Sequence, residues 1–283
     1  MIEPIDLLHL GAERVIGVYL LDTEDGPALF DCGPSTCVER LKAALRERGL
    51  ELTDVRHLLL SHIHLDHAGA TGVLVREHPR LQVHVSEIGA PHLVEPDKLE
   101  ASARRLYGDA FDDLWGELAP VPAENIHPVG DRVLGLECFP SPGHASHHVV
   151  YVGSDGTAYC GDAAGVRIQP HELVLPPTPP PEFDLDGWHR TIDELARRQP
   201  EALVLIHFGV AHDPPRHLAE LRLRLDRWVE VVGAGASEEA FADSVAAESG
   251  ADPEVVAEYE RAMPFWQSYA GLKRYRDKRN NRA

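Results

Sequence analysis

The sequence predicts an α/β protein with layered sheets and helices, and three observations support this prediction. Apolar, β-rich runs alternate with helix-spaced segments up to residue 207. Strands followed by helices are the order expected of sheets covered by helices. After residue 207 the β signals stop, and three helical patterns follow at residues 215–231, 237–248 and 253–275. We therefore expect a sheet-containing domain followed by a helical extension.

The first half of the chain supplies paired strands and then an alternation of strands and helices. Residues 14–21 and 28–30 are predicted to be strands joined by a turn, and residues 38–48 have helical spacing. A strand at 56–60, a helix at 70–77 and a strand at 81–85 follow. Residues 97–118 form a mostly helical insertion whose aromatic stripe is typical of core packing, with substrate contact as the alternative.

The second half repeats the strand signals before it becomes helical. Strands are predicted at 133–139, 149–152, 157–160 and 202–206, with a stiff proline-rich segment at 176–181. A helix is predicted from Asp184 to about residue 198. Ser237 and Asp252 have the side chains preferred at helix N-caps, and they mark the starts of two of the C-terminal helices.

The composition excludes several classes of protein. The 283 residues carry a net charge of −19, from 27 Lys and Arg against 46 Asp and Glu, which argues against a nucleic-acid partner. No apolar run is long enough to span a bilayer, and the first residues lack a signal pattern. The four cysteines are scattered without a C-x-x-C pair, as expected in a reducing compartment. We expect a cytoplasmic protein with no membrane partner.

The segment from Ser61 to Gly69 concentrates ligand-type side chains directly after a buried strand. His62 and His64 alternate, so an extended backbone can point both imidazoles at one centre. Asp66 and His67 follow where the chain turns, and they can face a second centre. A lone histidine is usually a hydrogen-bonded structural residue, but imidazoles this close would repel unless a cation held them. The spacing therefore predicts a metal site.

Three further residues of the same chemical type follow later strands. His144 lies in a loop after one strand, Asp162 follows Gly161 after another, and His207 ends the strand at 202–206. Each position is weak evidence alone. Together with the first segment they give seven nitrogen and oxygen ligands, each at or just beyond the end of a strand.

This pattern resembles the metallo-β-lactamase superfamily: His-x-His-x-Asp-His, then Gly-His, then Gly-Asp, then a terminal His, over about residues 8–210. The resemblance implies an αββα four-layer sandwich, with residues 1–212 as the catalytic domain and 213–283 as a C-terminal helical extension. It also implies two divalent ions, zinc by default and iron or manganese as alternatives. The implied ligands are His62, His64 and His144 for one ion, Asp66, His67 and His207 for the other, and Asp162 for both.

Other matches imply supporting roles around those ligands. Asp31 matches the family's strand-end aspartate that orients a metal-bound imidazole. His148 matches a hydrogen-bonding position of the family, whereas His147 is expected to face solvent. Asp66 is the residue expected to act in acid/base catalysis, next to a hydroxide shared by the two ions.

The resemblance leaves the substrate open. The segment after Ser61 is similar to that of lactonases and glyoxalase II-type thioesterases, which implies cleavage of an ester-type bond in a small molecule. Such lactonases carry a tyrosine three residues after the bridging aspartate, where this chain has Gly165. A phosphodiesterase of the same fold and an iron-dependent persulfide dioxygenase are the alternatives. The aromatic face at 263–269 predicts packing on the sandwich, with a lid or a homodimer contact as alternatives.

Overall fold

The computed structural model describes residues 2–250 and 252–281. The chain divides into two compact units. The N-terminal unit comprises residues 1–140 and 147–154, and the C-terminal unit comprises residues 141–146 and 155–283.

A six-stranded sheet forms the centre of the N-terminal unit. Its strands lie in chain order: β1 (Ile5–Asp6), β2 (Gly17–Thr23), β3 (Gly26–Phe30), β4 (His57–Leu59), β5 (Gln82–Val85) and β6 (Ile126–Pro128). β1, β2 and β3 pair antiparallel, and β3 to β6 pair parallel, so the sheet is mixed. β1 lies at the start of residues 5–31, which were expected to form strands, whereas the short β6 was not predicted, because three residues give no measurable periodicity.

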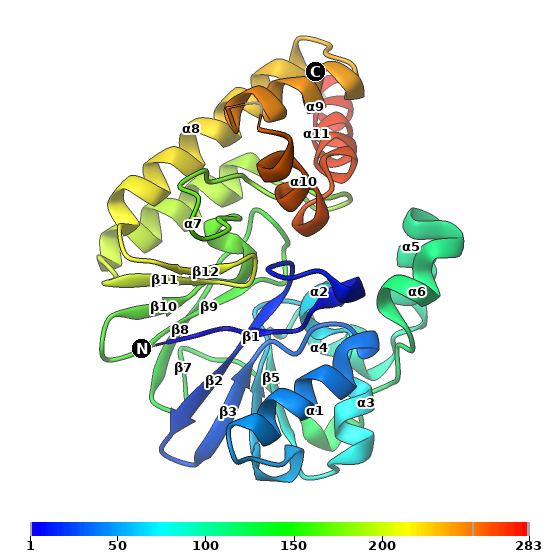
Figure 1. The fold of residues 1–283 in the computed structure, drawn as a ribbon, viewed down its shortest axis with the longest axis vertical. Coiled ribbons are helices and arrows are strands. Elements are labelled where there is room, and N and C mark those ends of the chain that lie inside the picture. Colours follow the sequence, from blue (N-terminus) through cyan, green and yellow to red (C-terminus); the bar gives the residue numbers. More distant parts are fainter. Residues whose placement is uncertain (1, 251, 282–283) are drawn as a thin grey trace. The chain divides into compact units, whose positions relative to one another are not determined.

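Helices cover this sheet and extend from it (Figure 1). They are α1 (Val38–Glu47), α2 (Leu65–Ala68), α3 (Thr71–Glu77), α4 (Ala90–Val94), α5 (Asp97–Tyr107) and α6 (Phe111–Trp115). The predicted insertion corresponds to α5 and α6, and its core is Ala103 and Phe111 packed with Leu65. Core packing of its aromatic stripe is therefore confirmed. Because Leu65 lies between His64 and Asp66, this packing also anchors the segment that carries the predicted ligands.

Three more strands of the N-terminal unit form an antiparallel ladder of β7 (Arg132–Val133), β8 (Leu136–Pro140) and β9 (Val149–Val152). The prediction of one strand over 133–139 is wrong. Leu134 and Gly135 have φ values of 50° and 82°, so the chain turns there and the two halves pair with each other. Left-handed φ values interrupt a strand, and Gly adopts them without steric cost.

The C-terminal unit contains β10 (Thr157–Tyr159), β11 (Ala202–Leu205) and β12 (Gly209–Ala211). β10 pairs parallel with β11, and β11 pairs antiparallel with β12. The prediction that strand signals stop at residue 207 is therefore wrong. Gly209 has φ of 112°, which allows a tight return of the chain into a strand too short to show a pattern.

Five helices accompany these strands: α7 (Leu185–Arg198), α8 (Pro214–Gly233), α9 (Glu238–Glu248), α10 (Pro253–Ala262) and α11 (Phe265–Asn280). Figure 1 shows α8 running along α7, with α11 against α8 and α9. The two predicted N-caps are confirmed, since Ser237 accepts a hydrogen bond from the Ala240 amide and Asp252 accepts one from the Glu254 amide. The single helix predicted at 253–275 is wrong. Pro264 lacks an N–H and disfavours helical backbone at Met263, so the chain breaks there.

The aromatic face at 263–269 packs within the C-terminal unit. Met263 and Phe265 are buried, and the Tyr269 hydroxyl donates a hydrogen bond to the Ala236 carbonyl. Trp266 keeps 36% of its surface exposed. A homodimer contact at this face stays a prediction.

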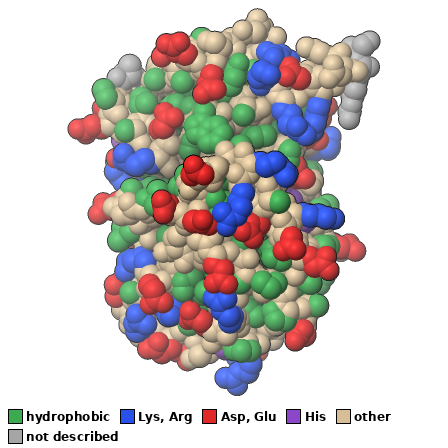
Figure 2. Space-filling model, turned by 90° about the vertical axis from the view of Figure 1, so that its right-hand side faces the viewer, with side chains coloured by type: hydrophobic (Ala, Val, Ile, Leu, Met, Phe, Trp, Pro, Cys, Tyr) green, Lys and Arg blue, Asp and Glu red, His purple; other side chains and the backbone are tan. Residues whose placement is uncertain are grey.

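The surface and the cysteines agree with the composition. Figure 2 shows acidic side chains interspersed with basic ones over the face drawn. Each of the four cysteines is buried and free of disulfides. Within residues 2–250 and 252–281, no helix is long and apolar enough to cross a membrane.

A group of buried histidines in the N-terminal sheet predicts acid sensitivity. His57 Nδ1 lies 3.1 Å from His84 Nε2, and burial followed by repulsion from His57 and His127 lowers the pKa of His84 to about 4. Because unfolded histidine titrates near 6.5, the unfolded chain binds more protons between pH 4 and 6.5. Stability should therefore rise by about 3 kcal/mol as pH rises through this window, and be fully present above pH 6.5.

The variant His84→Gln tests this prediction by urea unfolding at several pH values. We expect a shallower rise of unfolding free energy between pH 4.5 and 6.5 than in the parent protein. His92→Gln, at a partly exposed position of α4, is the control and should keep the parent slope. Equal slopes for all three proteins would contradict the assignment.

Candidate metal centre

The predicted ligand segment follows the buried strand β4 and then enters a short helix. His62 lies three residues beyond the end of β4, and His64 occupies the N-cap of α2. Asp66 and His67 lie within α2, so the predicted turn after His64 is confirmed as helical. The extended residues and the helix together direct four ligand-type side chains from six consecutive residues.

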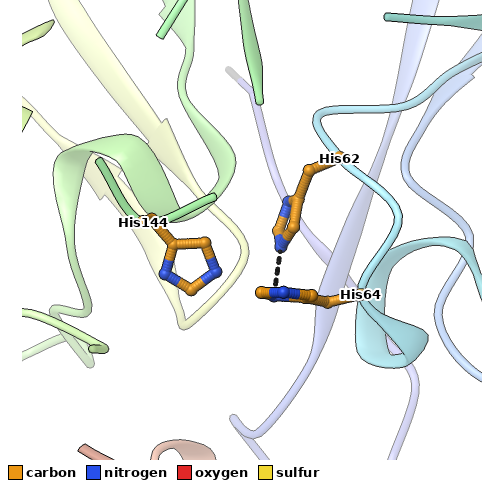
Figure 3. Close-up of side chains that lie close together, drawn as sticks. All are labelled: His62, His64 and His144. Atoms are coloured by element: carbon orange, nitrogen blue, oxygen red, sulfur yellow. Dashed lines mark hydrogen bonds between the residues drawn. The ribbon is translucent and has the colours of Figure 1, made fainter. Parts of the chain in front are cut away.

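Within the N-terminal unit these side chains lie close to one another. His62 Nε2 is 2.9 Å from His64 Nδ1, and a dashed line marks this contact between the two rings in Figure 3. The rings of His62 and His67 lie 4.0 Å apart between centroids. His62 and His67 are both fully buried. Buried imidazoles at this spacing need a shared proton or a cation to lower their mutual repulsion.

Asp31 fixes the orientation of His67. Its carboxylate accepts hydrogen bonds from the Ser61 amide and the Ser61 hydroxyl, both at 2.7 Å, and lies 2.8 Å from His67 Nδ1. Burial raises the pKa of Asp31, and the contacts with His67 and Ser61 oppose that rise. Only the ionised carboxylate accepts from all three donors. These contacts hold the His67 imidazole in one orientation, and the binding of a metal ion by that imidazole stays a prediction.

This arrangement leaves a nitrogen lone pair directed at a second carboxylate. If His67 donates from Nδ1 to Asp31, its Nε2 carries a lone pair. That Nε2 lies 3.6 Å from Asp66 Oδ2, which is also an acceptor. Two acceptors at this separation attract only if a proton or a metal ion lies between them.

His147 and His148 lie beside the same segment. The expectation that His147 faces solvent is wrong: it is 6% exposed, its Nδ1 accepts from the Ile63 amide, and its carbonyl accepts from Ser86. The register of β9 explains this burial, since the Val149 amide donates to the Ser61 carbonyl. The His148 ring stacks on His62 at 4.8 Å between centroids, and its hydrogen-bonding role stays a prediction.

The C-terminal unit brings together the other three predicted residues. His144, also drawn in Figure 3, directs Nε2 at Asp162 Oδ2 over 3.3 Å, and its Nδ1 lies 2.8 Å from the Pro177 carbonyl. A carbonyl can only accept, so His144 donates from Nδ1 and keeps a lone pair on Nε2. His207 Nε2 lies 3.8 Å from the other oxygen, Asp162 Oδ1. Again imidazole nitrogens face a buried carboxylate.

Helices α7 and α8 hold the turn that carries Asp162. This 3₁₀ turn, η6 (Gly161–Ala164), accepts a hydrogen bond from Trp188 Nε1 at the Ala163 carbonyl and one from His217 Nε2 at the Ala164 carbonyl. Burial lowers the pKa of His217 to about 4, so it is a neutral donor at pH 7. Sequence reasoning missed these contacts, because neither side chain lies near Asp162 in the chain.

Gly143 allows the close approach of the His144 loop to α7. A Cβ at this position would lie 2.3–2.6 Å from backbone and Cβ atoms of Trp188, and its φ is 139°. We expect Gly143→Ala to lower the unfolding free energy by about 1–3 kcal/mol through overpacking and to displace His144. Urea unfolding measures the first effect. Gly130→Ala, whose Cβ would meet nothing within 4 Å, is the control, and equal losses in both variants would contradict this reading.

The donor sets in both units fit divalent cations. Two ligands of a tetrahedral ion, each about 2.1 Å from it, lie about 3.4 Å apart. The separations of 3.3, 3.6 and 3.8 Å between imidazole nitrogens and carboxylate oxygens lie close to that value. Each of the seven predicted residues offers a ligand atom to a cluster of His and Asp side chains that could hold a metal ion.

Comparison with known proteins identifies the family of this arrangement. A family model described as the metallo-beta-lactamase superfamily matches residues 13–207. A metallo-beta-lactamase family protein from Thermus thermophilus is 22% identical, with a TM-score of 0.70 over 98% of this chain and 93% of that one. An archaeal superfamily protein from Sulfolobus tokodaii is 21% identical, with a TM-score of 0.63 over 81% of this chain and 85% of that one.

A third solved structure carries metal. TTHA1623, described in a di-iron-bound form, is 23% identical, with a TM-score of 0.55 over 77% of this chain and 95% of that one. At these identities the structural matches show the fold, and the family model shows the family. The predicted fold class, with C-terminal helices α8–α11, and the predicted resemblance are confirmed.

Proposed function

The chain belongs to the metallo-β-lactamase superfamily, and we propose that it is a hydrolase that uses two divalent ions to cleave an ester-type bond in a small molecule. His62, His64 and His144 would hold one ion, Asp66, His67 and His207 would hold the other, and Asp162 would serve both. Residues 1–212 form the catalytic domain and 213–283 the extension.

One observation carries the proposal: each unit holds an imidazole with its lone pair directed at a carboxylate oxygen. Asp31 fixes His67 in this state, and the Pro177 carbonyl fixes His144. Metal-binding histidines are oriented in this way by a partner on the other ring nitrogen. A purely structural histidine would gain more by donating to the carboxylate than by facing it with a lone pair.

The chain's own residues would bind, orient and move protons around the ions. Two adjacent divalent ions, when bound, lower the pKa of a shared water towards 7 and polarise the oxygen of an electrophile. Asp66 keeps 23% of its side chain exposed, whereas His67 beside it is fully buried. Of the two proposed carboxylate ligands, Asp66 is therefore the one that solvent and substrate can reach, since Asp162 is buried, and we assign Asp66 the acid/base role.

The ligands are nitrogen and oxygen atoms, which zinc, iron and manganese all accept. We propose zinc in both positions and keep iron as the alternative, because a structural relative is described in a di-iron-bound form. The two metals are distinguished by metal analysis of the protein purified without added metal.

Gly165 bears on the substrate. A Cβ at this position would lie 2.8 Å from Leu221 Cδ1 and 2.9 Å from the Leu175 carbonyl, so a tyrosine does not fit there. Gly165 therefore cannot be replaced by the tyrosine that the lactonases carry at the corresponding position. We propose a thioester or another carboxylic ester as the substrate, ahead of a lactone. The net charge of −19 supports a small molecule rather than a nucleic acid.

A substrate panel tests this proposal with zinc-loaded protein. We expect turnover of thioesters or simple carboxylic esters, and loss of turnover and a lower melting temperature after chelation, because bound metal stabilises the folded state. Turnover of phosphodiesters alone would favour the phosphodiesterase alternative. Oxygen uptake with a persulfide, in protein with one iron per chain, would favour the dioxygenase. No turnover on the whole panel, with a melting temperature insensitive to chelation, contradicts the proposal.

A further inference from the structure

The C-terminal helix α11 contacts the segment that orients His144. This segment, residues 177–183, runs between the His144 loop and α11 within the C-terminal unit. On one side the Pro177 carbonyl accepts from His144 Nδ1 at 2.8 Å. On the same side Glu182 accepts from both the amide and the hydroxyl of Ser146, at 2.9 and 2.7 Å. The segment therefore fixes the position of the His144 loop directly.

On its other side the segment is held by α11 at three separate places. Thr178, adjacent to Pro177, donates from its amide to Ser268 Oγ at 3.3 Å and from its hydroxyl to the Ser268 carbonyl at 3.1 Å. Further along, Phe183 packs edge-on against Tyr275, and Lys278 donates to the Pro181 carbonyl. Thr178 and Ser268 are almost completely buried, so water does not compete for these bonds.

Gly271 makes the contact as close as a backbone permits. A Cβ at Gly271 would lie 1.9 Å from the Thr178 carbonyl oxygen and 2.8 Å from the Pro179 carbonyl carbon. Any side chain at this position must push α11 and the segment apart. Gly271 lies inside α11, and alanine is normally favoured over glycine inside a helix by about 1 kcal/mol. The close contact with the segment therefore explains the glycine, and helix propensity does not.

We infer that α11 is a positioning element for a metal ligand: through Thr178 and Pro177 it sets the tautomer and orientation of the His144 imidazole. The inference rests on the proposed role of His144 as a ligand of one ion. It gives the C-terminal extension a function besides packing, and makes Thr178, Ser268 and Gly271 positioning residues. Loosening the contact between α11 and this segment should lower the affinity for one ion far more than the affinity for the other. The reason is that the Pro177 carbonyl contacts His144, which is a proposed ligand of one ion.

The central test compares two helical glycines. Gly271→Ala forces the contact apart, whereas Gly233→Ala, at the end of α8, adds a Cβ that meets nothing within 4 Å. The first readout is the ¹⁵N shift of the His144 ring nitrogens in metal-free protein, which reports the tautomer without any bound ion. We expect a single Nδ1–H tautomer in the parent protein and in Gly233→Ala, and a mixture in Gly271→Ala.

The second readout is calorimetric titration of zinc. We expect Gly271→Ala to lower the affinity for one ion by about 10- to 100-fold and to leave the other within a few-fold, the range found when outer partners of metal ligands are lost. If Gly271→Ala does not fold, the same two measurements are made on Thr178→Val. This variant removes the hydroxyl that donates to the Ser268 carbonyl and keeps the shape of the side chain. Thr178→Ser, which retains that hydroxyl, should restore the parent tautomer and affinity.

The inference would be overturned if Gly271→Ala and Thr178→Val both showed the His144 tautomer and the two zinc affinities of the parent protein. An equal loss of affinity for both ions would also overturn it, since that pattern indicates a general loosening of the structure. The tautomer readout separates this inference from the proposed function. A parent protein that binds no zinc would contradict the proposed function, while the tautomer comparison would still decide the role of α11.

Discussion

Replacing Asp162 by alanine should remove both metal ions and reduce kcat/KM for the substrate by more than about 100-fold, because loss of even an outer partner of a metal ligand costs 10- to 100-fold. The two oxygens of Asp162 face different imidazoles, Oδ2 towards His144 and Oδ1 towards His207. A carboxylate placed between two nitrogen ligands in this way can serve two ions at once. No other described carboxylate of the C-terminal unit has this position.

Metal analysis after dialysis, together with steady-state kinetics, measures this effect. Asp243→Ala, at an exposed position of α9, is the matched control and should keep the parent metal content and activity. If Asp162→Ala retains two ions per chain, Asp162 is not the shared ligand and the proposed assignment fails.

The second large effect is expected for Asp31→Asn. Asparagine keeps the shape of the side chain and tolerates the left-handed backbone at this position, where φ is 57°. Its amide group, however, has only one acceptor oxygen, so when that oxygen accepts from the Ser61 amide, an NH2 donor occupies the Oδ2 position that faces the Ser61 hydroxyl and His67. His67 must then accept at Nδ1 and carry its proton on Nε2, which turns a donor towards Asp66 and the metal position.

We expect Asp31→Asn to lower the affinity for one ion by about 10- to 100-fold. We also expect it to lower the unfolding free energy by about 1–3 kcal/mol, which is the cost of leaving a buried polar group without its partner. Zinc titration and urea unfolding measure the two effects. Asp22→Asn, at an exposed position of β2, should change neither. Parent zinc affinity in Asp31→Asn would mean that His67 does not bind the metal through Nε2.

The candidate metal ligands could be recognised in the sequence because they are local signals at strand ends. His62, His64, Asp66 and His67 lie within six residues after an apolar strand, and Asp31 ends another strand. Their types and spacing are set by what a metal ion needs, which makes the pattern specific. The family model, the fold and the contact between Asp31 and His67 agree with that prediction.

What the sequence did not reveal depends on contacts between distant parts of the chain. His217 and Trp188 support the Asp162 turn from helices that lie 55 and 26 residues further on. Pro177 orients His144 through a backbone carbonyl, which leaves no mark on the residue type. The burial of His147 follows from strand register, and β12 is too short to show alternation. Such features are fixed by tertiary packing rather than by local pattern.

We propose that one chain holds two metal ions through its histidines and aspartates. Calorimetric titration of metal-free protein with zinc tests it most directly. We expect two equivalents bound per chain in the parent protein and none held tightly by Asp162→Ala. One equivalent or fewer in the parent protein, or two equivalents that persist in Asp162→Ala, would contradict it.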